Sequence, residues 1–257
     1  LKNIITNRHI LAVILANFFN SFKSVGGSSE SYFWLNNTGS LLNQTICGLF
    51  TGIPNYIMVP IAAKMVKKWG ERATSIIECL FGFFAYMSLF FVGFHPFGQT
   101  FKDHYIFNLI WVIFGLTICG LPNKILNVSG QIVTAEALDY MEWKHGLRNE
   151  ALVTTVQGYF GKLATSVTGW LSGMVLTWIN YVPLTDSLGN AVPQTDPTML
   201  NGIWAVFCIL PALARGLYGV SFIIYPIHGD LQQQMIVELA EKRAQRLAEQ
   251  EAKDHQA

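Results

Sequence analysis

Six apolar segments, each long enough to cross a bilayer as a helix, follow one another along the chain. The third, ATSIIECLFGFFAYMSLFFVGF, is the clearest of them, and the first is the most polar. These segments stay apolar around most of the helix, whereas a water-soluble helix has a polar face that recurs every turn. The pattern therefore predicts membrane-spanning helices at residues 10–33, 41–63, 73–94, 105–132, 151–179 and 201–225.

The composition supports a membrane protein and excludes other classes. Of 257 residues, 51% are hydrophobic and only 13% are charged, compared with about 25% charged in a typical soluble domain. A net charge of +1 leaves no basic domain for nucleic acid. All four cysteines lie in apolar segments without metal-ligand spacing, so we expect buried or lipid-facing thiols, no metal site in this chain and no organic cofactor.

Basic residues mark one side of the predicted spans as cytoplasmic. Twelve of the 17 Lys and Arg residues lie in the N-terminal stub, the turns after the second and fourth spans, and the C-terminal tail. The opposite loops, at 34–40, 95–104 and 180–200, hold only Lys102. We expect both ends of the chain to be cytoplasmic, in a multi-pass protein of the cell (inner) membrane.

The predicted domains are a six-helix transmembrane bundle at residues 1–228 and a cytoplasmic helical tail at 229–257. In the tail, Leu231, Met235 and Leu239 form a narrow apolar stripe among charged and amide residues. We favour a solvated or membrane-skimming helix for this segment over a helix that binds a partner.

Lys162 is the clearest functional candidate, because a charge inside a bilayer is costly unless it faces a partner or water. It lies near the middle of the fifth span, beside small residues at every fourth position that let another helix approach closely: Gly161, Thr165, Gly169 and Gly173. We predict that Lys162 binds a substrate hydroxyl or replaces a cation in a shared site. The alternative is a purely structural pairing with a carbonyl or carboxylate.

Further polar residues lie in the first and fourth spans. Lys23 is seven residues from Glu30, on one face of a regular helix, and for it a binding role and a structural role both stay open. In the fourth span we expect Pro122 to interrupt the helix, with Asn127 near mid-depth, as at many transporter binding sites. Hydrogen bonding between helices would explain the amide equally well.

Two other ionisable residues receive less specific interpretations. Glu78 is expected close to the membrane interface, where it would face a Lys or Arg. The pattern assigns no role to Arg215 or to Lys124.

The segment between the fourth and fifth spans, AEALDYMEWKHGLRNEALVTTVQ, interleaves acids and bases and is expected to form a turn. Asp139 and Arg148 are the natural pair for a salt-bridged cytoplasmic gate, and Glu142 could join them. Exposed pairs contribute little individually, but a cluster that forms in only one conformation biases a two-state equilibrium.

Within this segment, DYMEWKHGLRNE resembles the loop signature of the glycoside–pentoside–hexuronide cation symporters, the melibiose-permease-like branch of the major facilitator superfamily. That signature is D-Y-G-E-[WFY]-K followed by G-x-R-x-E, and this chain departs from it at Met141 and His145. NRHILAVILANFF and SYFWLNNTG resemble the two ends of the family's seventh helix. YVPLTD resembles the end of its eleventh helix, ILPALARGLYGVSFIIYPI its twelfth, and LQQQMIVELAEKRA its tail.

The resemblance implies an all-α fold in which the six spans are helices seven to twelve, the C-terminal bundle of a twelve-helix transporter. It also implies that Lys162 and Gln157 correspond to a lysine and a glutamine of the family's eleventh helix, near its cation and sugar sites. Asp139 and Arg148 correspond to the gate charges. Asn127 replaces a tryptophan of some members, and the family's cation-coordinating acids lie in the N-terminal half.

The expected function is cation-coupled symport of a sugar or glycoside by alternating access. The expected partners are the sugar, a coupling cation (Na⁺, H⁺ or Li⁺), the bilayer and the N-terminal six-helix half of the same transporter. A non-transporting membrane sensor and an independently dimerising six-span half stay open as alternatives. A membrane enzyme is disfavoured, because the chain lacks H-E-x-x-H and G-x-S-x-G.

Overall fold

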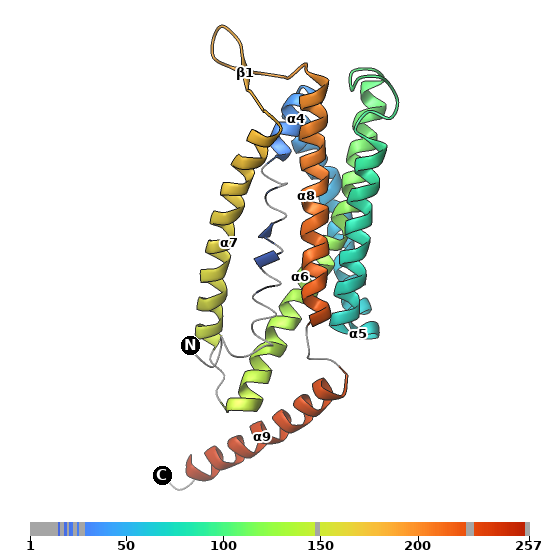
Figure 1. Cartoon of the computed structure of the whole chain (residues 1–257). Coiled ribbons are helices and arrows are strands. Elements are labelled where there is room, and N and C mark those ends of the chain that lie inside the picture. Colours follow the sequence, from blue (N-terminus) through green and yellow to red (C-terminus); the bar gives the residue numbers. More distant parts are fainter. Residues whose placement is uncertain are drawn as a thin grey trace.

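A computed structural model describes residues 15, 18–19, 21–22, 25, 29–146, 150–224 and 229–254, and this part of the chain is almost entirely helical (Figure 1). Most of the first predicted span lies outside the described residues, as do Lys23 and Arg148. The elements are α4 (Glu30–Thr38), α5 (Leu42–Val92), α6 (Tyr105–His145), α7 (Glu150–Trp178), β1 (Leu184–Thr185), β2 (Ala191–Val192), α8 (Pro197–Ile224) and α9 (Asp230–Asp254).

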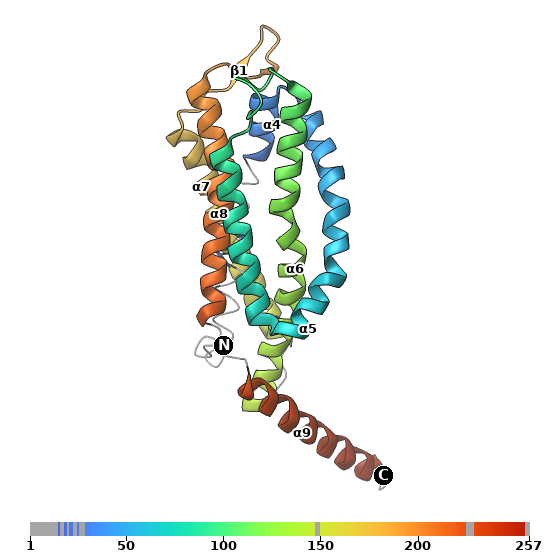
Figure 2. The ribbon, with the colours of Figure 1, turned by 90° about the vertical axis from the view of Figure 1, so that its right-hand side faces the viewer.

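Helix α5 contains both the second and the third predicted span, because it reverses direction near its middle (Figure 2). At Gly70 the backbone leaves the helical region, with φ 78° and ψ 165°. Glycine reaches this conformation readily, whereas residues with a Cβ rarely do. The reversal falls in the basic stretch predicted to be the turn between these two spans, so the two arms of α5 are the predicted helices.

Helix α6 extends beyond the end predicted for the fourth span. It continues to His145, so the acidic and basic segment expected to form a turn is helical up to that residue. The expected interruption at Pro122 is also wrong, since α6 runs through this residue. The 41 residues of α6 cover about 60 Å, twice the roughly 30 Å of a hydrocarbon core. This helix therefore reaches well past the membrane.

The end of the bundle beside the β1–β2 hairpin is here called the outer end, and the end beside α9 the inner end (Figure 1). Aromatic side chains hold the outer end together. Phe33 of α4 stacks on Phe207 of α8, with ring centroids 4.9 Å apart and planes 3° apart. Trp204 of α8 lies 5.1 Å from Phe33 and donates its indole N–H to the carbonyl of Phe90 on α5. These contacts fix α4, α5 and α8 to one another.

At the inner end, α9 packs against α6 rather than standing free. Met235 and Leu239 of its apolar stripe are 1% and 4% exposed. Met235 belongs to a cluster that includes Leu138 and Met141 of α6 and Phe222 of α8. The interpretation of the tail as a solvated or membrane-skimming helix is therefore wrong for this face, because the stripe is covered by the protein itself.

The apolar surface is that of a membrane protein. Three helices of the described part are long and apolar enough to cross a membrane: Leu42–Val92, Tyr105–Lys144 and Pro197–Ile223. Large apolar side chains such as Phe84, Phe91 and Phe107 are exposed. The all-α membrane fold is confirmed, while the count of six spans stays a prediction. The four cysteines are buried free thiols, in line with the expectation for apolar segments.

We expect Gly70→Ala to lower the free energy of unfolding by about 1–3 kcal/mol, because alanine must adopt a backbone conformation that its Cβ disfavours. A Cβ at Gly70 meets no atom within 4 Å, so the cost is conformational and not steric. Gly52→Ala, in the same helix with equally open space and no left-handed φ, is the matched control. Thermal unfolding in detergent, followed by circular dichroism, measures both, and equal effects would contradict the prediction.

Candidate functional site

Four charged side chains join α6 to α9 at the inner end, and we call them the inner clamp: Asp139, Glu142, Arg243 and Arg246. The guanidinium of Arg243 donates to Asp139 at 2.8 Å and to Glu142 at 2.5 Å. Arg246 lies 3.4 Å from the other oxygen of Glu142 and also donates to the backbone carbonyl of Gly146. The Glu142 side chain is only 7% exposed, so its charge depends on these partners.

Hydrogen bonds extend the inner clamp along both helices. The indole N–H of Trp143 on α6 donates to Glu238 on α9 at 2.7 Å, and Lys242 donates to the backbone carbonyl of Trp143. Near the start of α9, the amide of Gln232 donates to Glu136 of α6 and to Glu71 of α5. The tail helix is thus bonded to both α6 and α5.

The pKa shifts in this region follow from the same contacts. Hydrogen bonds from Gln234 and, secondly, from Trp143 hold the pKa of the Glu238 carboxyl below its ordinary value. The hydrogen bonds to Glu142 and Asp139 raise the pKa of the Arg243 guanidinium above its ordinary value. Both groups therefore keep their charges across the physiological pH range.

Asp139 and Glu142 of the predicted gate lie together at the inner end, and both bind Arg243 of the tail helix. Arg148 lies outside the described residues, so its pairing with Asp139 stays a prediction. The contact between α9 and α6 could have been predicted from the sequence of the tail. Arg243 and Arg246 follow Met235 and Leu239 at helical spacing, so all four share one face of α9.

A second polar cluster is buried between α5, α6 and α8. Arg215 of α8 is 3% exposed and donates to the side-chain oxygen of Asn123 on α6. Glu78 of α5, 2% exposed, interacts electrostatically with Arg215. Glu78 therefore does face an arginine, as expected, but inside the bundle instead of at the interface. It forms no hydrogen bond within the part of the chain that the structure describes.

Gly82 makes room for this cluster. A Cβ at Gly82 would lie 3.3 Å from both Cδ and Nη1 of Arg215, tighter than an ordinary van der Waals contact. Gly82 is one helical turn from Glu78 on the same face of α5. The missing side chain lets the guanidinium of Arg215 lie against α5, on the face of the helix that carries Glu78.

The residues predicted to bind sugar and cation lie on different helices, and Lys23 lies outside the described residues. Lys162 on α7 and Asn127 on α6 are exposed, and no described residue bonds to the Lys162 ammonium. Gln157 is half-buried, and its amide nitrogen has no partner among the described residues. The exposure of Lys162 and the partial burial of Gln157 agree with their separation of about 140° around the helix. Their binding roles stay predictions.

The small-residue stripe beside Lys162 is also uncovered. Added Cβ atoms at Gly161, Gly169 and Gly173 would meet no other described atom within 4 Å. This face of α7 is therefore open to a neighbouring helix that the described part of the chain does not supply.

A helical bundle of apolar spans with few charges in its interior is typical of a polytopic membrane protein. The chain matches the family described as MFS/sugar transport protein over residues 1–229, and it belongs to that family. The resemblance carried by DYMEWKHGLRNE and the flanking segments is thereby confirmed.

Individual relatives agree with this family. The chain is similar to the uncharacterized symporter YjmB of Bacillus subtilis, at 29% identity over 245 residues, which cover 94% of this chain and 48% of that protein. An isoprimeverose transporter of Lactiplantibacillus pentosus is 28% identical over 120 residues, covering 46% of this chain and 23% of the relative. A putative sulfoquinovose importer of Escherichia coli is 35% identical over 89 residues, covering 32% and 18% respectively.

Two coarse conclusions follow from these relatives. All three are named for transport and not for catalysis, which supports a sugar-transport class over an enzyme. The chain spans about half the length of YjmB, the relative that it matches along almost its entire sequence.

We expect Arg243→Ala to release α9 from α6. The variant loses charge-assisted hydrogen bonds to Asp139 and Glu142, but Arg243 is half-exposed, so amide hydrogen exchange in α9 should accelerate only about three- to tenfold. Gln245→Ala, an exposed change on the same helix, is the control. Exchange in the unmodified protein should also accelerate with salt, and unchanged exchange in Arg243→Ala would contradict the clamp.

We expect Arg215→Met to lower the free energy of unfolding by about 1–3 kcal/mol, because the side-chain oxygen of Asn123 loses its donor inside the bundle. The double variant Glu78→Gln/Arg215→Met also changes the carboxyl that interacts with Arg215, so a smaller loss than in Arg215→Met shows that the two residues are coupled. Thermal unfolding in detergent compares the three proteins. A double variant as unstable as Arg215→Met would show that the two charges are not coupled.

Proposed function

We propose that this chain forms the C-terminal half of a secondary transporter that carries a sugar or glycoside across the cell membrane together with a cation. Two six-helix halves rock around a site at mid-membrane, and Na⁺, H⁺ or Li⁺ supplies the driving force. Both ends of this chain lie on the cytoplasmic side, so the inner end of the bundle is cytoplasmic. Family membership and the names of the sugar-transporting relatives support the substrate class.

The observation that carries the proposal is the position of Lys162. It lies 12 residues from the start of α7 and 16 from its end, about 18 Å and 24 Å along the helix. Neither end is within easy reach of the ammonium group. An exposed lysine at this depth, with no counter-charge among the described residues, is too costly to face lipid. It therefore faces a water-filled cavity or the opposite half.

Lys162, Gln157, Asn127 and Lys23 form the wall that this half contributes to the transport site. The ammonium of Lys162 donates to sugar hydroxyls, or occupies the cation position when the coupling ion leaves. The uncovered stripe of small residues on α7 lets a helix of the N-terminal half approach closely. That half supplies the carboxylates that hold the coupling cation.

The inner clamp, together with Arg148, closes the cytoplasmic side when the site faces outward. Its charges lie at the end of α6, beyond the apolar part of the helix, where water can reach them once the halves separate. A cluster of this kind forms in one conformation and breaks in the other, and its free energy biases the equilibrium between them.

We expect Lys162→Ala to reduce cation-driven sugar uptake by the full-length transporter at least tenfold, because it removes the charge at the shared site. Lys162→Arg keeps the charge and should retain cation binding while sugar affinity falls. Lys64→Ala, an exposed lysine in the α5 turn, is the control. Uptake is measured in membrane vesicles with labelled isoprimeverose and sulfoquinovose, with and without an imposed Na⁺ or H⁺ gradient.

Unchanged, gradient-dependent uptake by Lys162→Ala would refute the role of this residue. Gradient-independent uptake by the unmodified transporter would refute cation coupling. Absence of uptake for every sugar tested would favour the non-transporting sensor.

A further inference from the structure

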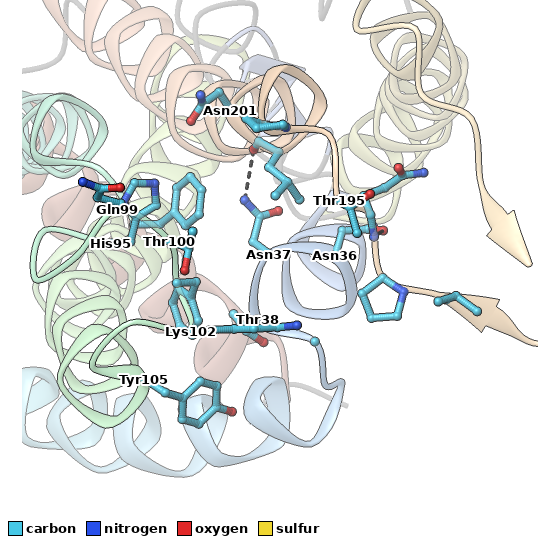
Figure 3. A pocket seen from close by; sticks show the side chains of 18 residues that line it. Asn36, Asn37, Thr38, His95, Gln99, Thr100, Lys102, Tyr105, Thr195 and Asn201 are labelled. Carbon is cyan, nitrogen blue, oxygen red and sulfur yellow. Dashed lines mark hydrogen bonds between the residues drawn. The ribbon is translucent and has the colours of Figure 1, made fainter.

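A pocket at the outer end, lined by both polar and apolar side chains, has no role in the transport mechanism above. Three parts of the chain surround it: the end of α4, the connection from α5 to α6, and the segment from β2 into α8 (Figure 3). Its volume is about 820 Å³, within the range of small-molecule sites. No residue of α7 lines it, so it is separate from Lys162.

The lining has the chemistry of a carbohydrate site. Amides and hydroxyls supply most of its polar groups, among them Asn36, Asn37, Thr38, Gln99, Thr195 and Asn201. The lining residues include Lys102 but neither Asp nor Glu. Neutral amides and hydroxyls that both donate and accept match the hydroxyls of a sugar, and the ammonium of Lys102 adds attraction for an acidic one.

Asn37 is the side chain that a ligand would satisfy. It is 6% exposed, and its amide N–H donates to the carbonyl of Leu200 at 3.0 Å. Its side-chain oxygen has no hydrogen-bond partner among the described residues. Figure 3 shows Asn37 between His95, Gln99 and Thr100 on one side and Asn36 and Thr195 on the other. A buried carbonyl oxygen rarely stays unpaired, and a sugar hydroxyl in the pocket would pair with it.

The surrounding walls are held in place before any ligand arrives. The side-chain oxygen of Asn36 accepts the backbone N–H of Gln194 at 3.2 Å, which ties α4 to the strand segment. Asn43 donates to Thr38 at 2.8 Å and to the hydroxyl of Tyr105 at 2.8 Å, which ties α4 and α5 to the start of α6. Because the pocket is preformed, little binding free energy is lost in ordering its side chains when a ligand binds.

Aromatic rings complete the lining. Phe94 and Phe101 are 4% and 5% exposed, and their rings stack with centroids 6.4 Å apart. Tyr105 lies edge-on to Phe101 at 5.5 Å. Sugars present an apolar C–H face as well as hydroxyls, so a lining with both aromatic and amide groups is suited to both sides of the ring.

We propose that this pocket is a second carbohydrate site, which binds one monosaccharide at the outer end and prefers an acidic sugar to a neutral one. The proposal rests on the proposed function for the choice of sugars as probes and for the other bound sugar that the test counts. Asn37 pairs with a ring hydroxyl, Lys102 attracts the carboxylate, and the aromatic rings contact the apolar face.

The test uses equilibrium dialysis of the full-length transporter in detergent against labelled glucuronate and glucose. Two bound sugars per transporter are expected for the unmodified protein and one for Thr195→Trp, which places an indole ring in the wall of the pocket. Thr198→Trp, an exposed change outside the lining, should still bind two. Lys102→Ala should weaken glucuronate binding at the outer site about tenfold and leave glucose binding almost unchanged, whereas Lys64→Ala should alter neither.

The two proposals fail differently. Two bound sugars in both Thr195→Trp and Lys102→Ala, with affinities as in the unmodified protein, would overturn the outer site. A single site that is lost in Lys162→Ala and kept in Thr195→Trp would overturn it as well. Loss of one site in Thr195→Trp, combined with full uptake by Lys162→Ala, would support the outer site and refute the role of Lys162 in transport.

Discussion

The cost of taking charged side chains out of water governs the arrangement of this bundle. Arg215 and Glu78 are both buried and interact electrostatically, and Asn123 accepts a hydrogen bond from the guanidinium. Gly82 leaves the space that this arrangement needs. Glu78, Asn123 and Arg215 come from three different helices. Their contacts therefore constrain how α5, α6 and α8 are positioned along one another.

The spans were predictable because hydrophobic length is a strong local signal. The basic run from Lys64 to Arg72 marked the reversal of α5, although the position of Gly70 within it depended on backbone conformation. The end of α6 was not predictable from hydrophobicity, because its last residues are polar and helical together. Their helix is stabilised by α9, which is about a hundred residues further along the chain, so the pattern within α6 itself does not show that contact.

In the candidate site too, some residues could be predicted from local sequence, whereas others depend on contacts between distant parts of the chain. The acids of the inner clamp could be found from their density in sequence, but their partners in α9 required the tail to fold back beneath α6. The sequence assigned no role to Arg215, because its neighbours Glu78 and Asn123 come from other helices. Lys162 was found because one charge in an apolar span is conspicuous. The outer pocket was missed, since its walls come from three connections whose polar residues look like ordinary loops.

Helix α6 connects the polar features that the chain keeps apart in sequence. Its first residue, Tyr105, lines the outer pocket, Asn123 contacts Arg215, and Glu142 belongs to the inner clamp. It is continuous between them, and a hydrogen-bonded helix is stiff compared with loops. In the proposed mechanism, a displacement of α6 on opening of the clamp would have to be accommodated at the other two places, at Asn123 or at the pocket wall. Both places are bonded in this structure, Asn123 to Arg215 and Tyr105 to Asn43, so both resist such a displacement.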